Sequence, residues 1–333
     1  MVNRHPRPPV LAVFNHKGGV AKTTTACNLA LCLAARGWRC LLIDLDAQGN
    51  AGASLGFTPP PTPMAGVTDL VAGHLAPGAG LVDTVYPNLS LLPAGGHSWQ
   101  NERADPATLE FWLAGCAGDV VVVDCPPALG AATRMALTIA DAIIMPTRPD
   151  PLAHQGLTHT WYETKRLRRE GSAHPVQAMI LLTLTDARGP LADEALAIRA
   201  EFGPAVLDAA IPYDTAISEA TRMTVPVVLF EPDGGAGRAY VDATAEIVRR
   251  LKLGPRSALP ASPSTETLLN TLRDWRAGRT ALRRLPHVDN RPPPASVARP
   301  APKPAGASRP WIIAALLIGA VLGAALQALL GSP

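Results

Sequence analysis

The fold of this 333-residue chain is decided by one short stretch, His16-Lys17-Gly18-Gly19-Val20-Ala21-Lys22-Thr23-Thr24-Thr25. An apolar run at residues 10–14 precedes it, and an apolar, helix-forming run at residues 26–34 follows it. A strand, a glycine-rich turn and then a helix is the context in which a phosphate-binding loop occurs. Glycines let the backbone approach an anion, and the helix N-terminus presents unpaired N–H groups to it. The stretch therefore predicts a nucleotide-binding loop.

The side chains of this loop are expected to supply the remaining phosphate and metal contacts. The spacing predicts that Lys22 reaches the terminal phosphates of a nucleoside triphosphate and that the Thr23 hydroxyl binds Mg²⁺. A glycine-rich surface turn with two solvated lysines is the alternative, and the flanking strand and helix patterns argue against it. The residues expected to contact the nucleotide are Gly18, Gly19, Val20, Ala21, Lys22, Thr23 and Thr24.

Two further apolar runs end on carboxylates. Residues 39–44 end at Asp44 and are followed by Asp46, and residues 119–124 contain four consecutive valines before Asp124. An unbroken valine run is typical of a strand that is covered on both faces. Ligands of open α/β sheets bind at the carboxyl ends of the strands, so these carboxylates are candidate site residues. Asp124 is expected to hold Mg²⁺ directly or through water. An Asx-rich turn with helix caps is the alternative for Asp44 or Asp46 alone.

Taken together, the three motifs resemble those of the ParA/MinD-type ATPases, whose P-loop is a deviant Walker A motif. The loop K-G-G-V-A-K-T-T carries the early lysine of that motif, and D-L-D-A-Q-G-N at 44–50 is similar to the second ParA motif. The valine run ending at Asp124 stands where the family has its Walker B carboxylate. A later stretch, I-P-Y-D-T-A-I-S-E-A at 211–220, resembles another ParA segment. The resemblance covers about residues 10–252.

This resemblance implies roles for individual residues. It implies that Lys17, Lys22 and Asp46 are catalytic, with Lys17 crossing an ATP-dependent homodimer interface to the partner's nucleotide. Asp46 would orient the attacking water, and Asp44 would lie near the Mg²⁺ shell that Thr23 and Asp124 also serve. Pro212 lies where the family frames the adenine. Hydrolysis of ATP is expected to be slow and to be raised by a partner protein, ParB-like or other.

The remaining pattern predicts an α/β fold with a doubly wound, mainly parallel sheet over residues 1–254. Apolar runs at 142–146, 179–185 and 206–211 alternate with helical patterns at 152–170, 190–202 and 237–251. Such alternation favours a parallel sheet with helices on both faces. The five cysteines show no metal-ligand spacing, which argues against a cluster-bearing relative such as the nitrogenase iron protein.

After residue 254 the composition changes. Ten basic residues stand against three acidic ones between Pro255 and Pro310, although the whole chain carries a net charge of only +3. We expect a basic, proline-rich linker over 255–310, containing an amphipathic helix at 265–285. That helix could lie on anionic lipid, touch nucleic acid or remain solvated.

Residues 311–330 form an uncharged apolar run that begins with Trp311. As a helix, twenty residues rise about 30 Å, the thickness of a bilayer's hydrocarbon core. Basic residues precede the run and none follows it, so the positive-inside bias predicts a single-pass C-terminal anchor with the ATPase on the cytoplasmic face of the inner membrane. A buried soluble helix is the alternative. Gly319 and Gly323 have the spacing of a helix-dimerisation face.

The sequence thus predicts a membrane-tethered, ParA-like ATPase that segregates or positions DNA or another cargo. ParA relatives often carry arginines where this chain has Tyr213 and Ala216, and those positions help to contact DNA in some of them. This departure weakens the expectation of nonspecific DNA binding. Two alternatives stay open: a nucleotide-gated membrane scaffold of MinD-like type, and a conjugation or secretion accessory ATPase.

Overall fold

The carboxylates and the glycine-rich loop are positioned by one sheet of eight strands. In the computed structural model, which describes residues 7–60, 64–95, 104–171, 177–186, 188–254 and 264–282, all neighbouring strands are parallel except the pair β3–β4. The spatial order is β3 (Val82–Asp83), β4 (Leu89–Leu92), β2 (Cys40–Asp44), β5 (Val120–Asp124), β1 (Val10–Val13), β6 (Ala142–Thr147), β7 (Gln177–Thr185) and β8 (Val206–Pro212). The predicted doubly wound, mainly parallel α/β sheet is confirmed.

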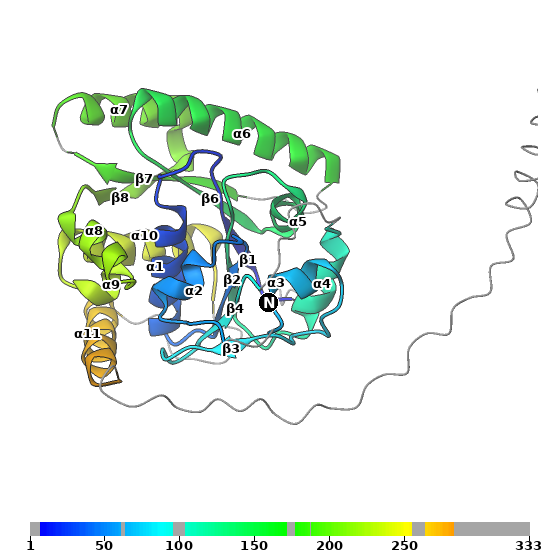
Figure 1. Ribbon diagram of the computed structural model, residues 1–333. Helices are drawn as coiled ribbons and strands as arrows, with labels where there is room; N and C mark the ends of the chain where they lie inside the picture. Colours follow the sequence, from blue (N-terminus) through cyan, green and yellow to red (C-terminus); the bar gives the residue numbers. More distant parts are fainter. Residues whose placement is uncertain are drawn as a thin grey trace, which may run out of the picture. The chain divides into compact units, whose positions relative to one another are not determined.

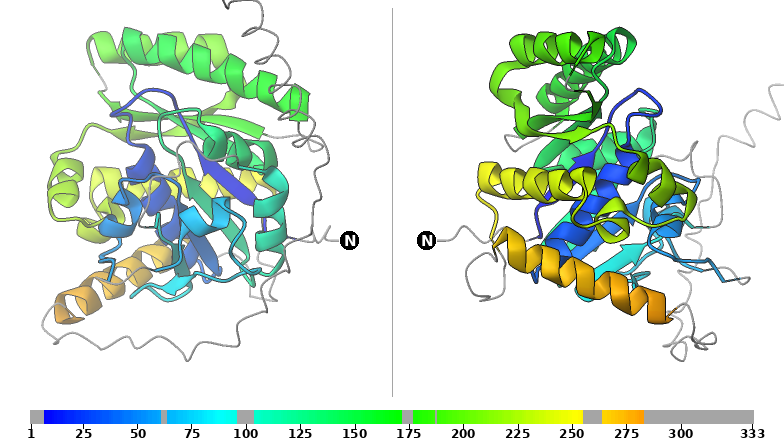
Figure 2. Two further views of the ribbon diagram at one scale, coloured as in Figure 1. Left: turned by 45° about the vertical axis from the view of Figure 1, so that its right-hand side comes forward. Right: turned by 90° about the vertical axis from the view of Figure 1, so that its left-hand side faces the viewer.

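Helices cover both faces of this sheet (Figures 1 and 2). One face carries α1 (Lys22–Ala35), α2 (Asn50–Ser54), α8 (Thr215–Arg222), α9 (Val227–Phe230), α10 (Gly235–Leu251) and α11 (Thr265–Leu282). The other face carries α3 (Val67–Val71), α4 (Pro106–Ala114), α5 (Ala131–Ile139), α6 (Pro151–Gly171) and α7 (Pro190–Phe202). A short 3₁₀ turn, Gly203–Ala205, leads into β8.

The valine run of β5 shows why this strand has no alternating pattern. Val120 and Val122 pack into the core under α1, whereas Val121 and Val123 pack into the core under α4 and α5. Successive side chains of a strand point to opposite faces, and both faces are apolar here because helices cover each of them. All four valines are fully buried. The same arrangement places Asp124 at the end of a central strand, next to β1 and the loop that follows it.

Helix α11 corrects the expectation for residues 265–285. Its apolar side chains Leu268, Leu269 and Leu272 are at most 1% exposed and pack into the core that contains α1, α9 and α10. Trp275 lies against Tyr86, with ring centroids 5.8 Å apart. The apolar face is therefore covered by the ATPase domain itself and is not free for lipid or nucleic acid. Helix α11 therefore packs as part of the ATPase core, whereas the sequence placed residues 265–285 in the linker.

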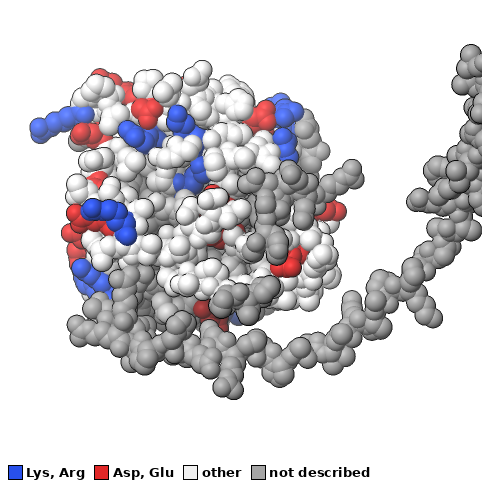
Figure 3. All heavy atoms as spheres, viewed as in Figure 1, with Lys and Arg blue, Asp and Glu red and all other residues white. Residues whose placement is uncertain are grey.

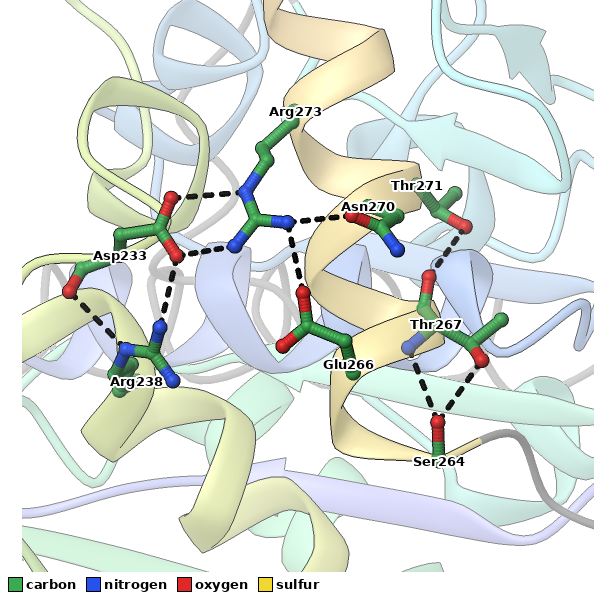
Figure 4. A network of polar contacts seen from close by, with 8 residues as sticks. All are labelled: Asp233, Arg238, Ser264, Glu266, Thr267, Asn270, Thr271 and Arg273. Atoms are coloured by element: carbon green, nitrogen blue, oxygen red, sulfur yellow. Dashed lines mark hydrogen bonds and ion pairs between the residues drawn. The ribbon is translucent and has the colours of Figure 1, made fainter.

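An arginine network also joins α11 to the segment before α10 (Figure 4). Arg273 donates two hydrogen bonds to the Asp233 carboxylate, at 2.8 and 2.5 Å, and its third nitrogen reaches Glu266 and Asn270. Arg238 donates to the same carboxylate at 3.0 Å. The hydrogen bond from Arg273 holds the pKa of Asp233 below its usual value. Because these groups are exposed, the network fixes the orientation of α11 more than it adds stability.

No helix in the described part of the chain combines the length and apolar character that a bilayer crossing requires. The predicted membrane span at 311–330, with Gly319 and Gly323, lies outside the described residues, as do the linker residues 255–263 and 286–310.

Candidate active site

The glycine-rich loop joins β1 to α1, as the motif predicted. Its backbone adopts the left-handed conformation at Gly19 (φ 72°) and again at Ala21 (φ 65°), the residue before α1. No side chain among the described residues caps the N-terminus of α1. The N–H groups of the first helical turn are thus available to an anion, and the helix dipole favours negative charge there. A side chain added at Gly18 or Gly19 would meet nothing within 4 Å, so the loop is open on its outer side.

The two lysines of the loop lie in opposite environments. Lys22 is buried, and its Nζ donates a hydrogen bond of 2.8 Å to the carbonyl of Lys17. Burial lowers the pKa of Lys22, and the charges of Asp124 and Asp46 oppose that effect. The Lys17 side chain is exposed, while its backbone N–H donates to Asn15 Oδ1 at 3.1 Å. Lys22 is therefore held inward, toward the carboxylates, and Lys17 is left at the surface.

The Asn15 side chain anchors the start of the loop to α6 and β6. The Asn15 amide donates to the carbonyl of Pro146 at 2.9 Å, and its Oδ1 accepts a hydrogen bond of 3.1 Å from the Thr160 hydroxyl. The backbone N–H of His16 donates to the same hydroxyl at 3.2 Å. Neither Asn15 nor Thr160 was predicted from the sequence. The one sequence feature that pointed to this contact was an asparagine directly after an apolar run.

Asp44 and Asp124 end neighbouring strands at the same register position. Both side chains are fully buried. The Asp44 carboxylate accepts backbone hydrogen bonds from Gly52 at 2.9 Å and from Asp46 at 3.4 Å. Burial nevertheless raises the pKa of Asp44 to about 6. Asp44 thus fixes the start of α2 while it keeps lone pairs for a further partner.

Asp124 is the more unusual of the two carboxylates. Neither of its oxygens has a hydrogen-bond partner within the described residues, although the Thr23 hydroxyl lies near enough to lower its pKa. Burial, followed by the charge of Asp44, raises the pKa of Asp124 well above its usual value. A buried carboxylate without partners fits a bound cation, because a cation restores the interactions lost on burial. Oxygen ligands of this kind, together with phosphate, are those that Mg²⁺ prefers.

Asp46 lies two residues beyond β2 and is partly exposed. One of its carboxylate oxygens accepts the Gln48 N–H at 3.0 Å, and its carbonyl accepts the Gly49 N–H at 2.9 Å. Its charge acts on Lys22 and on Asp124, so it belongs to the same cluster.

Pro212 is the one expected site residue that stands apart from this cluster. It ends β8 as the register partner of Thr185, and a Cβ added at Gly235 of α10 would lie 3.7 Å from its ring. It thus occupies the carboxyl edge of the sheet, where α/β proteins bind ligands. Its contact with an adenine stays a prediction.

Two residues behind the loop, Asn28 and Thr25, also had no role predicted from the sequence. Asn28 is buried in α1, where its amide donates to the Thr24 carbonyl at 2.7 Å and its Oδ1 accepts the Val228 N–H at 3.0 Å. The Thr25 hydroxyl contacts the Tyr240 hydroxyl at 3.3 Å. These contacts tie the first turn of α1 to α9 and α10. Only tertiary structure reveals them, although an asparagine inside an apolar helical run was a weak signal.

The fold and this cluster define a P-loop nucleotide-binding protein of the α/β class. A family model described as an AAA domain matches residues 9–102 and 116–175. The chromosome partitioning protein ParA of Caulobacter vibrioides is 36% identical over 257 residues, which cover 72% of this chain and 94% of that protein.

Two solved structures have a similar fold. Cobyrinic acid a,c-diamide synthase from Mycobacterium smegmatis, with a bound ATP analogue and magnesium, is 31% identical with a TM-score of 0.61, over 74% of this chain and 96% of that one. The septum site-determining protein MinD from Pyrococcus horikoshii, complexed with Mg-ADP, shares the fold at 22% identity with a TM-score of 0.58, over 72% and 96% of the two chains.

The chain therefore belongs to the ParA/MinD-type P-loop ATPases. It binds ATP with Mg²⁺ and hydrolyses ATP, and the family predicted from the three motifs is confirmed.

Proposed function

We propose that this ATPase positions or segregates a cargo, DNA or another, as an ATP-dependent homodimer tethered to the cytoplasmic face of the inner membrane. The Caulobacter relative is a chromosome partitioning protein, and the resemblance covers 72% of this chain and 94% of that protein. The tether is the single-pass C-terminal segment at 311–330, whose apolar run and preceding basic residues support it.

The main support for the dimer is that the side chains of the two loop lysines lie in different environments. Lys22 is turned inward and serves its own site. Lys17 is exposed on the same loop and has no ion-pair partner among the residues described. An exposed cation beside a phosphate cradle can stabilise negative charge in a second, facing site, as an arginine finger does. Lys17 would then act on the nucleotide of the partner protomer.

The remaining roles follow from positions in the cluster. The N–H groups of the loop and the Lys22 ammonium hold the terminal phosphates. Thr23 and Asp124 would hold Mg²⁺, with Asp44 beside them, and the ion would neutralise charge on the phosphate oxygens. Asp46 would orient the attacking water. Catalysis by positioning and charge neutralisation gives slow turnover until a partner protein completes the arrangement.

The surface gives limited support to DNA as the cargo. Tyr213 is 70% exposed, whereas Ala216 is buried at the start of α8 and is not available to DNA. On the face shown in Figure 3, basic and acidic side chains are interspersed, with no broad basic area among the described residues. Nonspecific DNA binding relies on such basic areas. A protein cargo is therefore left open beside DNA.

The test measures ATP turnover of the purified full chain, alone and with DNA, with anionic lipid vesicles, or with the product of a neighbouring gene. Lys22→Ala is expected to lose nucleotide binding, whereas Asp46→Ala is expected to keep ATP bound and to trap the dimer. Stimulation by DNA or by the neighbouring protein supports the proposal. ATP-dependent capture of a partner without any turnover would instead indicate a nucleotide-gated scaffold.

The tether is tested by fractionation. The full chain should be found with the membranes, and a truncation after Leu285 should be soluble because it keeps α11 but lacks the span. Equal solubility of the two chains would remove the anchor from the proposal.

A further inference from the structure

The backbone of Lys17 is held by hydrogen bonds on both sides of its Cα atom. Its N–H donates to Asn15 Oδ1 at 3.1 Å, and its carbonyl accepts the Lys22 ammonium at 2.8 Å. Each peptide group is planar, so two fixed peptide groups set φ and ψ of the residue between them and thereby the direction of its Cα–Cβ bond. The exposed Lys17 side chain therefore leaves the loop in one defined direction.

The chain that follows Lys17 is the adaptable side of this residue. Gly18 and Gly19 come next, and a Cβ added at either would meet nothing within 4 Å. Gly19 also has φ 72°. Glycine has the widest choice of backbone conformations, so these two residues do little to fix their neighbour. The direction of Lys17 therefore depends on the residues that precede it.

Thr160 of α6 holds those preceding residues. Its hydroxyl accepts the backbone N–H of His16 at 3.2 Å. The single hydrogen of this hydroxyl has two acceptors within reach, Asn15 Oδ1 at 3.1 Å and the Gly156 carbonyl at 2.8 Å. Asn15 and Thr160 are fully buried, where the loss of a hydrogen bond leaves its partner unsatisfied. One hydroxyl thus connects α6 to the two residues before Lys17.

The same helix also leaves room for the lysine. A Cβ added at Gly156 would lie 3.7 Å from the Lys17 Cβ, so the base of the lysine side chain lies beside α6 at this glycine. Gly156 and Thr160 are four residues apart and therefore lie on one side of the helix. The open position and the hydroxyl together place Lys17 between an anchored backbone and the surface of α6.

We propose that Thr160 is a positioning residue for ATP hydrolysis: through Asn15 it fixes the direction in which Lys17 extends to the partner's nucleotide. The inference rests on the proposed function, in which Lys17 acts across the dimer. It adds that α6 determines where that lysine lies. Binding of ATP relies on the N–H groups of α1 and on Lys22, which follow the two glycines, so loss of the Thr160 hydroxyl affects turnover more than binding.

Replacement of the Thr160 hydroxyl by a methyl group in the full chain tests the proposal. Thr160→Val keeps the branched shape and should lower kcat about tenfold, because a small misplacement of a reacting group is costly, while the Kd for MgATP changes by less than about twofold. Thr160→Ser keeps the hydroxyl and should restore kcat to within about twofold of the wild type.

Thr164→Val is the matched control. Thr164 is also buried, one turn further along α6, and its hydroxyl donates to the Thr160 carbonyl at 2.6 Å, within the helix. The same change of hydroxyl to methyl at this position should leave kcat and the Kd for MgATP at their wild-type values. A general disturbance of α6 would instead affect both variants alike.

Mixed dimers distinguish a misplaced Lys17 from a damaged nucleotide site. Equal amounts of Thr160→Val and Asp46→Ala should recover about a quarter of the wild-type rate, because a mixed dimer joins the intact Asp46 of one protomer to the well-placed Lys17 of the other. Thr160→Val mixed with Lys17→Ala should show no recovery above the mean of the separate variants, since neither protomer supplies a well-placed lysine.

A double variant separates this inference from the proposed dimer. In single-turnover measurements, Thr160→Val should slow hydrolysis in the wild-type background and have no further effect in Lys17→Ala, because Thr160 acts through Lys17. This expectation holds whichever nucleotide the lysine contacts. Failure of Lys17→Ala and Asp46→Ala to complement each other would contradict the proposed dimer, and the double variant would then still decide whether Thr160 acts through Lys17.

Thermal unfolding of each variant establishes that it is folded, and Thr160→Ala replaces Thr160→Val if the latter does not fold. A wild-type kcat in Thr160→Val would overturn the proposal. So would an equal loss in Thr164→Val, a parallel loss of kcat and MgATP affinity, a Thr160→Ser variant as slow as Thr160→Val, or a further loss when Thr160→Val is added to Lys17→Ala.

Discussion

Asp44 and Asp124 are register partners at the carboxyl ends of β2 and β5, and both carboxylates are fully buried. The charge of Asp44 contributes to the raised pKa of Asp124, whose oxygens have no hydrogen-bond partner among the described residues. Two buried carboxylates side by side destabilise the protein when no cation is bound. For the same reason they strongly favour the binding of a cation. If this pair binds Mg²⁺, the stability of the domain should depend on that ion.

The first prediction concerns Asp124→Asn. Removal of the buried charge should stabilise the protein in EDTA by about 1–3 kcal/mol, because the neutral amide is cheaper to bury than an unpaired carboxylate. The same variant should lose Mg²⁺-dependent ATP hydrolysis. Thermal unfolding in EDTA and a phosphate-release assay measure the two effects. A variant that is less stable than the wild type in EDTA would contradict the interpretation of Asp124.

The second prediction concerns pH. The pKa of Asp44 is about 6 in the folded protein against 3.8 in the unfolded chain, so the folded state binds the proton more tightly. Stability in EDTA should therefore rise as the pH is lowered from 7 to 5, by about 1 kcal/mol from this group. Urea unfolding at a series of pH values measures it. In Asp44→Asn this part of the rise in stability should be absent. A wild-type pH dependence in that variant would show that another group causes the effect.

The third prediction concerns Ala21, which adopts a left-handed backbone conformation with φ 65°. This conformation costs a residue with a Cβ about 1 kcal/mol, which glycine avoids. Ala21→Gly should therefore raise the thermal midpoint by a few degrees and keep ATP binding, whereas Ala21→Val should weaken both. Calorimetry and nucleotide titration of both variants measure this. Equal stability of the two variants would show that the loop relaxes around the side chain.

The fourth prediction concerns α11. Leu272 is fully buried, so Leu272→Ala should cost about 2–5 kcal/mol, whereas Asp274→Ala on the exposed side should change stability by less than about 0.5 kcal/mol. A chain ending at residue 254 should also be less stable than one ending at Leu285. Urea unfolding compares the four proteins. Equal stability of the two truncations would show that α11 is not an integral part of the domain.

The sequence was sufficient for features that local chemistry dictates. The glycine-rich loop, the valine run of β5 and the carboxylates after β2 and β5 each carry a pattern that one element explains, and the structure brings Lys22, Asp44, Asp46 and Asp124 together. The docking of α11 was not predictable, because the sequence of an apolar helix face does not identify the surface that packs against it. The role of Asn28 depends on a contact with Val228, which lies 200 positions away and which only the folded chain defines.

The final prediction tests the dimer, on which the account chiefly depends. Lys17→Ala and Asp46→Ala should each be nearly inactive alone. If Lys17 acts on the partner's nucleotide, a mixed dimer contains one complete site: the Asp46 of the Lys17→Ala protomer and the Lys17 of the Asp46→Ala protomer. Equal amounts, mixed before ATP is added, should then recover about a quarter of the wild-type ATPase rate, since about half of the dimers are mixed and each has one working site. No recovery above the sum of the two separate variants would contradict the account.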